Sequence, residues 1–111
     1  MNRLKGKQNI TALFKSGEKI IISPLCLFYK KNNNMAYGIS AGKRSFSLAV
    51  ERNKIKRLLR EGARKHLFSA FDCLEDNFHF MILYIDKKKP DSNELEESFK
   101  RLVEQIKKDL F

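Results

Sequence analysis

One stretch of this chain, residues 78–85, constrains the fold more than any other. It reads Phe-His-Phe-Met-Ile-Leu-Tyr-Ile and is almost uninterrupted apolar sequence. Strands covered on both faces have this composition, whereas strands with one wet face alternate apolar and polar residues. The stretch therefore predicts a central strand with packed layers on both sides, and the 111 residues of the chain are enough for one domain with a hydrophobic core.

Periodicity and turn residues predict the other elements. Their order is αβββαβα, which we interpret as a single domain over residues 1–111, an α/β (α+β) two-layer sandwich with a four-stranded sheet. Residues 1–7 form a basic N-terminal arm that is expected to be mobile at its start. The expected elements are helices over 10–16, 48–68 and 93–109, and strands over 20–22, 25–31, 35–41 and 78–85.

Capping and turn residues set the expected boundaries of these elements. Asn9 and Ser47 have side chains that can cap the first two helices, and Gly17 is a typical helix stop. Pro24 interrupts the first strand because proline has no N–H to donate to a ladder. Asn32-Asn33-Asn34 is a tight connection, so the strands on either side of it are expected to pair as a hairpin.

The helix over residues 49–64 has two faces of opposite character. At about 100° per residue, an arc of roughly 100° carries most of its cations, and the apolar residues lie on the opposite side. The polar arc holds Asn53, Lys56, Arg57, Arg60 and Arg64, and the apolar side holds Leu48, Ile55, Leu58, Leu59 and Gly62. We expect the apolar side to face the core and the cationic stripe to face a polyanion.

The charge of the chain is strongly polarised along the sequence. Residues 43–65 contain nine Lys and Arg against two Glu, whereas residues 72–111 contain seven against ten Asp and Glu, within a total charge of +10. A basic face favours nucleic acid as the partner; an anionic membrane surface and a merely solvated face are the alternatives. Cations that neutralise phosphates release counterions, so such a stripe binds strongly and in a salt-dependent way.

The sequence shows no catalytic set of its own. It has no paired carboxylates in an apolar setting, no glycine-rich phosphate loop, and no nucleophile at readable spacing from His66 or His79. Cys26 and Cys73 lack partners at metal-ligand spacing, which indicates two reduced, mostly buried thiols. We find no signal-peptide pattern or membrane span and expect a cytoplasmic protein.

A second candidate surface lies on the sheet. An aromatic and apolar floor could form here, and its candidates are Phe14, Leu25, Phe28, Tyr29 and Tyr37, beside Lys30, Lys43 and Arg44. Unpaired bases stack on such floors with about 1–3 kcal/mol each. Alternation along the strand cannot decide which of Phe28 and Tyr29 faces outward. Core packing is favoured for each ring taken singly, and tyrosine is the better candidate for an exposed ring because its hydroxyl tolerates water.

Residues 49–61 closely resemble the Arg-Asn-Arg signature of the bacterial ribonuclease P protein family. The family pattern, roughly Arg-Asn-x-x-Lys-Arg-x-x-Arg-Glu after an Ala-Val pair, is matched at every position. The similarity also covers Arg3-Leu4-Lys5, Phe14-Lys15-x-Gly17 and Tyr37-Gly38-Ile39-Ser40-x-x-Lys43, so it spans nearly the whole chain. Ile10 and Gly62 depart from the family, in which many relatives carry Phe and Ala.

The resemblance implies a fold like a domain of ribosomal proteins, with a left-handed βαβ crossover around the signature helix. It implies a subunit of ribonuclease P, an endoribonuclease that removes the 5′ leader of precursor tRNA and whose catalytic RNA carries the active site. No catalytic residue would then lie in the protein. Mg²⁺ would be held mainly by the RNA, with Asn53 reaching it only through water. The implied partners are the catalytic RNA and precursor tRNA, with no membrane, and weak self-association stays open.

The same resemblance assigns roles to individual residues. In the signature helix, the residues that bind the RNA would be Arg52, Asn53, Lys56, Arg57, Arg60 and Arg64. The cleft that grips the leader would contain Phe14, Phe28 or Tyr29, Lys43 and Arg44.

Other interpretations of the basic helix stay open. A non-enzymatic RNA-binding module associated with the ribosome would use the same stripe, and a sequence-specific DNA binder would place the helix in a major groove. The DNA interpretation is weaker because no dimerisation segment or helix-turn-helix partner precedes the helix. A membrane role is weakest, since the core needs the apolar side of the helix.

Overall fold

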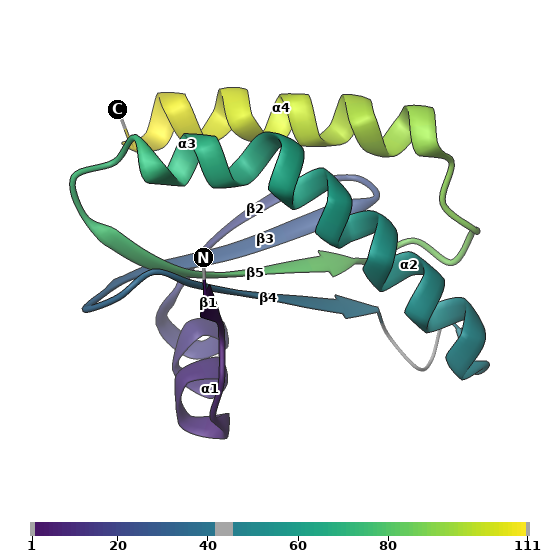
Figure 1. Ribbon diagram of the computed structural model, residues 1–111, viewed down its shortest axis with the longest axis horizontal. Coiled ribbons are helices and arrows are strands. Elements are labelled where there is room, and N and C mark those ends of the chain that lie inside the picture. The colour runs from purple at the N-terminus through teal and green to yellow at the C-terminus, as the bar shows by residue number, and fades with distance from the viewer. Residues whose placement is uncertain (1, 42–45, 111) are drawn as a thin grey trace.

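A computed structural model describes residues 2–41 and 46–110 of the chain, and it has the sandwich architecture and the element order that the sequence predicts (Figure 1). The sheet separates a layer of helices from α1 on its other side. The elements are β1 (Asn2–Arg3), α1 (Lys7–Ser16), β2 (Glu18–Ile22), β3 (Leu25–Asn32), β4 (Ala36–Ala41), α2 (Ala49–Gly62), η1 (Ala63–Leu67), α3 (Phe68–Asp72), β5 (Asn77–Tyr84) and α4 (Ser92–Leu110).

β5 occupies the centre of the sheet, as its apolar sequence predicts. The strand order is β1-β4-β5-β3-β2. β3 pairs antiparallel with β5 along its whole length, from Leu25 opposite Tyr84 to Asn32 opposite Asn77. β4 runs parallel to β5 on the other side. Both backbone edges of β5 are therefore paired, and the hand of the crossover from β4 to β5 stays a prediction.

The expected hairpin between β3 and β4 is wrong. β5 lies between these strands, and β3 instead pairs with β2, across Ser23-Pro24. The Asn32-Asn33-Asn34 turn reverses the chain, but a turn does not decide which strand occupies the neighbouring position. The more apolar β5 takes that position because it buries both of its faces there.

The N-terminal arm is part of the sheet rather than a free extension. β1 pairs in parallel with β4, with Asn2 opposite Ala36 and Arg3 opposite Tyr37. The Leu4 amide continues the contact by donating to the Tyr37 carbonyl at 2.6 Å. The four predicted strands thus gain a fifth of two residues, because the outer edge of β4 offers free backbone groups.

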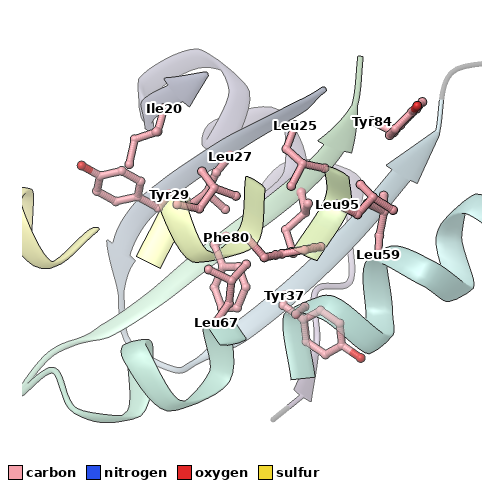
Figure 2. Close-up of a cluster of buried hydrophobic side chains, with 14 of the residues drawn as sticks. Ile20, Leu25, Leu27, Tyr29, Tyr37, Leu59, Leu67, Phe80, Tyr84 and Leu95 are labelled. Carbon is pink, nitrogen blue, oxygen red and sulfur yellow. The ribbon is translucent and has the colours of Figure 1, made fainter. Parts of the chain in front are cut away.

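Alternation along the strands gives the sheet two different faces. α2, η1, α3 and α4 lie on one face, and α1 lies against the other (Figure 1). On the helix-rich face, Phe80 and Leu27 from the sheet meet Leu59, Leu67 and Leu95 from α2, η1 and α4 in a buried core (Figure 2). This core fixes α2 on the sheet and so decides which side of α2 faces outward.

The first helix starts earlier than predicted. α1 begins at Lys7, so Asn9 lies inside its first turn and donates its amide to the Lys5 carbonyl at 3.1 Å instead of capping the helix. The Gly17 stop is confirmed, since its N–H donates to the Leu13 carbonyl at 2.9 Å. A Cβ on Gly17 would collide with that carbonyl, so the close approach requires glycine.

The second helix differs from its prediction at both ends. α2 begins at Ala49, and its N-cap residue is Leu48, so the cap expected from Ser47 is wrong. The helix then continues through η1, a π-helical segment, and α3 to Asp72. Burial of Phe71 in the core holds this extension against the sheet.

Candidate nucleic-acid interface

α2 and the start of η1 present the cationic stripe, called the α2 stripe below, on the side that faces away from the core. Asn53, Arg57 and Arg64 are exposed, and Lys56 and Arg60 are half-buried. Within residues 2–41 and 46–110, none of these side chains forms an ion pair with a carboxylate. The positive charge of the stripe is therefore available to a partner.

Arg52 is held differently from the rest of the signature. Its Nη1 group donates to the carbonyl oxygens of Phe46 at 2.9 Å and Ser47 at 2.8 Å. Two hydrogen bonds from a charged donor tie the segment before α2 to the first turn of the helix. Arg52 thus positions the N-terminal end of the stripe, a function that its place in the sequence did not reveal.

A groove of about 520 Å³ runs along the stripe. Its lining residues are Val50, Asn53, Lys54, Lys56, Arg57 and Arg60. Lys54 was not among the predicted residues, because it lies about 100° around the helix from Asn53. The local density of cations in the sequence was the only signal for it.

Two further hollows extend this groove around the edge of the sheet. One, of about 260 Å³, shares Lys56 and Arg60 with the first and reaches Arg3 and Leu4. The other, of about 560 Å³, shares Arg3 and Leu4 with the second and reaches the start of α1 and His79. We call these three hollows together the basic groove. Its cations are Arg3, Lys5, Lys54, Lys56, Arg57 and Arg60.

Arg3 and Lys5 join this surface only through tertiary structure. Pairing of β1 with β4 brings the start of the chain beside α2, from which it is far removed in sequence. As part of a basic arm, the two residues gave no sign of this position. Arg64, which follows α2 in η1, is exposed but does not line the three hollows.

The α1 face of the sheet carries an aromatic pair. The rings of Phe14 and Phe28 pack edge to face, with centroids 4.8 Å apart. Phe14 is 39% exposed and Phe28 is half-buried, so the pair is open to solvent. Lys30 adds a cation on this face and donates to the Ser16 hydroxyl at 3.2 Å. Such a pair can accept a stacked base.

Tyr29 does not belong to this face, and its predicted place in the leader cleft is wrong. Successive residues of a strand point to opposite faces, so Phe28 faces α1 and Tyr29 enters the helix-side core. Tyr29 is 6% exposed and packs against Phe78 with ring centroids 6.2 Å apart. Leu25 and Tyr37 are buried in the same core, so their predicted place on an open floor is wrong too. The other two residues predicted for the cleft, Lys43 and Arg44, lie outside the described residues.

Both histidines make structural contacts within the described residues. His79 is buried, with Asn32 Nδ2 at 3.2 Å from its Nδ1 and Asn34 Oδ1 at 3.0 Å from its Nε2. Burial lowers the pKa of His79 and favours the neutral ring. His66 Nε2 lies 3.0 Å from Glu96 Oε1, which ties η1 to α4.

No metal cluster is found in the part of the chain that the structure describes, where no three His, Cys, Asp or Glu side chains gather. The two cysteines are free. Cys26 is buried, and burial raises the pKa of its thiol, but Cys73 is exposed, so the prediction of mostly buried thiols is wrong for Cys73. None of the described helices is long and apolar enough to cross a membrane.

The fold and the basic groove define a class of small α+β sandwich proteins in which one helix presents a cationic face. The chain belongs to the ribonuclease P protein family, because a family model described as Ribonuclease P matches residues 1–107. The family assignment made from the signature helix is therefore confirmed.

Individual relatives agree with this assignment. The ribonuclease P protein component of Porphyromonas gingivalis is 35% identical over 81 residues, which cover 67% of this chain and 58% of that protein. The corresponding protein of Macrococcus caseolyticus is 28% identical over 104 residues, which cover 91% of this chain and 86% of that protein. The match thus spans little more than half of the first relative and most of the second.

A solved structure confirms the fold. The RNase P protein of Staphylococcus aureus superposes with a TM-score of 0.74 over 100% of this chain and 99% of that chain, at 22% sequence identity. At this identity the similarity shows the architecture alone, and that architecture is the predicted αβββαβα sandwich.

Proposed function

We propose that this chain is the protein subunit of ribonuclease P, an endoribonuclease that acts as a complex with a catalytic RNA. The subunit binds that RNA and the 5′ leader of precursor tRNA, and promotes cleavage that leaves the mature 5′ end. The observation that carries the proposal is the basic groove, which leads from the α2 stripe to the α1 face of the sheet. The complex would work in the cytoplasm, and weak self-association of the subunit belongs to the same proposal.

The α2 stripe suits the phosphates of the catalytic RNA. Arg57 and Arg64 are exposed and can each form a two-pronged contact with phosphate oxygens. Asn53 lies among the cations, where its amide can donate and accept at once. We assign Arg52, Asn53, Lys56, Arg57, Arg60 and Arg64 to the RNA contact, with Arg52 acting also through the segment that it holds.

The α1 face suits a single-stranded leader. An unpaired base can stack on the open edge of the Phe14–Phe28 pair, and such stacking is worth about 1–3 kcal/mol per base. The cations of the basic groove then follow the backbone of the strand. We propose Lys43 and Arg44 as further leader contacts on the strength of the family resemblance.

Mg²⁺ is best held by the RNA. The groove beside Asn53 is lined by Lys54, Lys56 and Arg57, whose charges oppose a bare cation. Asn53 can still accept a hydrogen bond from a water of a hydrated ion that the RNA holds. The ion would supply the activation of the attacking water, and the protein would supply the placement of leader and RNA.

Reconstitution with a bacterial catalytic RNA tests the proposal. Cleavage of precursor tRNA with a long or a short leader is measured at low Mg²⁺, with and without the protein. We expect the protein to raise the cleavage rate and to tighten binding of the long-leader substrate. Arg57→Ala should weaken that binding roughly fivefold, the loss of one exposed phosphate contact, without changing the unfolding temperature.

Lys100→Ala provides the matched control, since Lys100 is an exposed cation on α4 outside the basic groove. It should leave cleavage and binding unchanged. RNA binding without any gain in cleavage would contradict the proposal and favour an RNA-binding module associated with the ribosome. If Arg57→Ala and Lys100→Ala changed binding equally, the α2 stripe would not be part of the RNA interface.

A further inference from the structure

The described residues cover the outer edge of β4 only in part. β1 pairs with Ala36 and Tyr37, and the Tyr37 carbonyl accepts from the Leu4 amide. Alternate residues of a strand direct their N–H and C=O groups to the same side, so Ile39 directs both groups to the edge that Tyr37 uses. β1 has ended by this point, and none of the backbone groups in the described part of the chain bonds to Ile39 there.

A buried donor lies beside this open edge. The Nε–H group of Arg60 is shielded from solvent and has no hydrogen-bond partner within the described ranges. Arg60 and Ile39 line the same hollow of about 260 Å³. A buried N–H without an acceptor is unfavourable, so the arrangement gains free energy when an acceptor enters.

The remaining walls of this hollow select what can enter. Arg3 and Lys56 place two more cations on it, and none of its lining residues is a carboxylate. Leu4, Ile10 and Met81 contribute apolar side chains to the same wall. Several donors and a positive field together favour an anion with several acceptor oxygens.

We propose that this hollow binds one phosphate of the RNA leader where the strand passes from the α2 stripe to the α1 face. Arg60 Nε–H and Ile39 N–H donate to its non-bridging oxygens, and Arg3 and Lys56 supply charge. The Ile39 carbonyl on the same edge suits the 2′-hydroxyl of the adjacent ribose, a donor that DNA lacks. This inference rests on the proposed function and adds to it a specific ribonucleotide position, read partly by the backbone of β4.

The experiment combines a charge-retaining variant with a scan of the leader. Precursor tRNAs, each with one neutral methylphosphonate in the leader, are bound to the complex reconstituted with a bacterial catalytic RNA. With the parent protein, we expect one position to lose about tenfold in affinity, the size of one charge-assisted contact. Arg60→Lys keeps the charge but removes the Nε–H, so it should bind the unmodified leader about tenfold more weakly. A methylphosphonate at that position should then cause no further loss of affinity.

Arg57→Lys is the matched control, because Arg57 lies on the same helix but does not line this hollow. With this variant, a methylphosphonate at the same leader position should still lower the affinity about tenfold. Replacing the Ile39 amide by an ester through chemical synthesis removes only the N–H, and should reproduce the loss at that position with an unchanged unfolding temperature. A single 2′-deoxy substitution there should weaken parent binding as well.

The outcomes separate this inference from the proposed function. If Arg60→Lys retains the positional loss of the parent, or if the loss is uniform along the leader, the phosphate pocket is refuted. A protein that still tightens binding of long leaders would then leave the proposed function standing. If the parent shows no effect of leader length at all, both proposals fail together.

Discussion

Gly62 shows how one missing side chain sets the spacing of two helices. A methyl group on Gly62 would overlap the ring of Phe99 in α4. Glycine lowers helix propensity by about 1 kcal/mol relative to alanine, so sequence alone counts this residue as a weakness of α2. The structure shows that the residue allows α4 to pack closely against the end of α2.

We expect Gly62→Ala to lower the free energy of unfolding by about 1–2 kcal/mol, because overpacking outweighs the gain in propensity. Urea unfolding followed by circular dichroism measures the change. Glu61→Ala is the control, since Glu61 precedes Gly62 in α2 and its side chain is exposed, and it should change stability by less than about 0.5 kcal/mol. A more stable Gly62→Ala would show that Phe99 moves aside without cost.

His79 makes the stability of the fold depend on pH. Burial lowers its pKa from the ordinary value of 6.5, so the folded protein favours the neutral ring. As the pH falls, the unfolded chain takes up a proton before the folded protein does. The contribution of His79 is therefore complete above about pH 6.5, and it is lost as the pH falls towards the lower pKa of the folded state.

The urea midpoint should accordingly be lower at about pH 5.5 than at about pH 7.5, and His79→Gln should lose most of this difference. Glutamine keeps a donor and an acceptor for Asn32 and Asn34. Glu96 acts in another range, because its contact with His66 and Lys65 lowers its pKa below 4.5 and its contribution is lost only in more acidic solution. A His79→Gln variant with the parent's pH profile would assign the effect to another group.

At the scale of elements, neighbouring residues of β3 have different roles, one on the open α1 face and one in the core. Phe28 lies on the α1 face beside Phe14, and Tyr29 lies in the core on the opposite face. Hydropathy could not tell these neighbours apart, because both are aromatic, and the expectation that tyrosine is the exposed ring is wrong for Tyr29. The position of α1 and of the helix layer decides between them.

Substitution by leucine at these two positions should separate the two roles. Phe28→Leu should weaken binding of the leader-bearing precursor by about tenfold, since a base loses its stacking partner, with a small effect on stability. Tyr29→Leu should lower the free energy of unfolding by about 1–3 kcal/mol and leave the affinity of the folded protein unchanged. Affinity measurements and thermal unfolding of both variants check this, and a reversal of the two effects would contradict the assignment of faces.

Most helices and strands could be predicted from sequence, but which strands pair with each other in the sheet could not. The apolar run of β5, the stop at Gly17 and the amphipathic α2 were read correctly because each depends on local composition and period. The β3–β4 hairpin failed because strand pairing is decided by which strand gains most from the centre of the sheet. Asn9 and Ser47 failed as caps because each helix starts at another residue.

At the scale of the whole molecule, the two edges of the sheet differ in the charge of the elements that lie against them. α2 and β1 contact β4 at one edge, and α4, which holds five acidic residues against four basic ones, contacts β2 at the other. The cations of the basic groove therefore lie on the side of the molecule away from that edge. A polyanion approaching the protein would be steered towards the β1–β4 side.

Binding of RNA should fall steeply with salt for this reason. With six cations in the basic groove, the slope of log affinity against log salt concentration should be about −4 for a single strand. Arg57→Ala should make the slope shallower by about 1. Titrations of a leader-bearing precursor at several salt concentrations measure both values. A slope near zero would show that phosphate contacts contribute little.

The sequence by itself determined the family, the central strand and the cationic side of α2, because a motif, an apolar run and a helical period are all local properties. Only the tertiary structure decided that β5 separates β3 from β4, that Phe28 rather than Tyr29 faces α1, and that Arg3 lies beside Arg60. These facts depend on which surfaces pack together across long stretches of chain. Packing is a property of the whole molecule, and no window of sequence contains it.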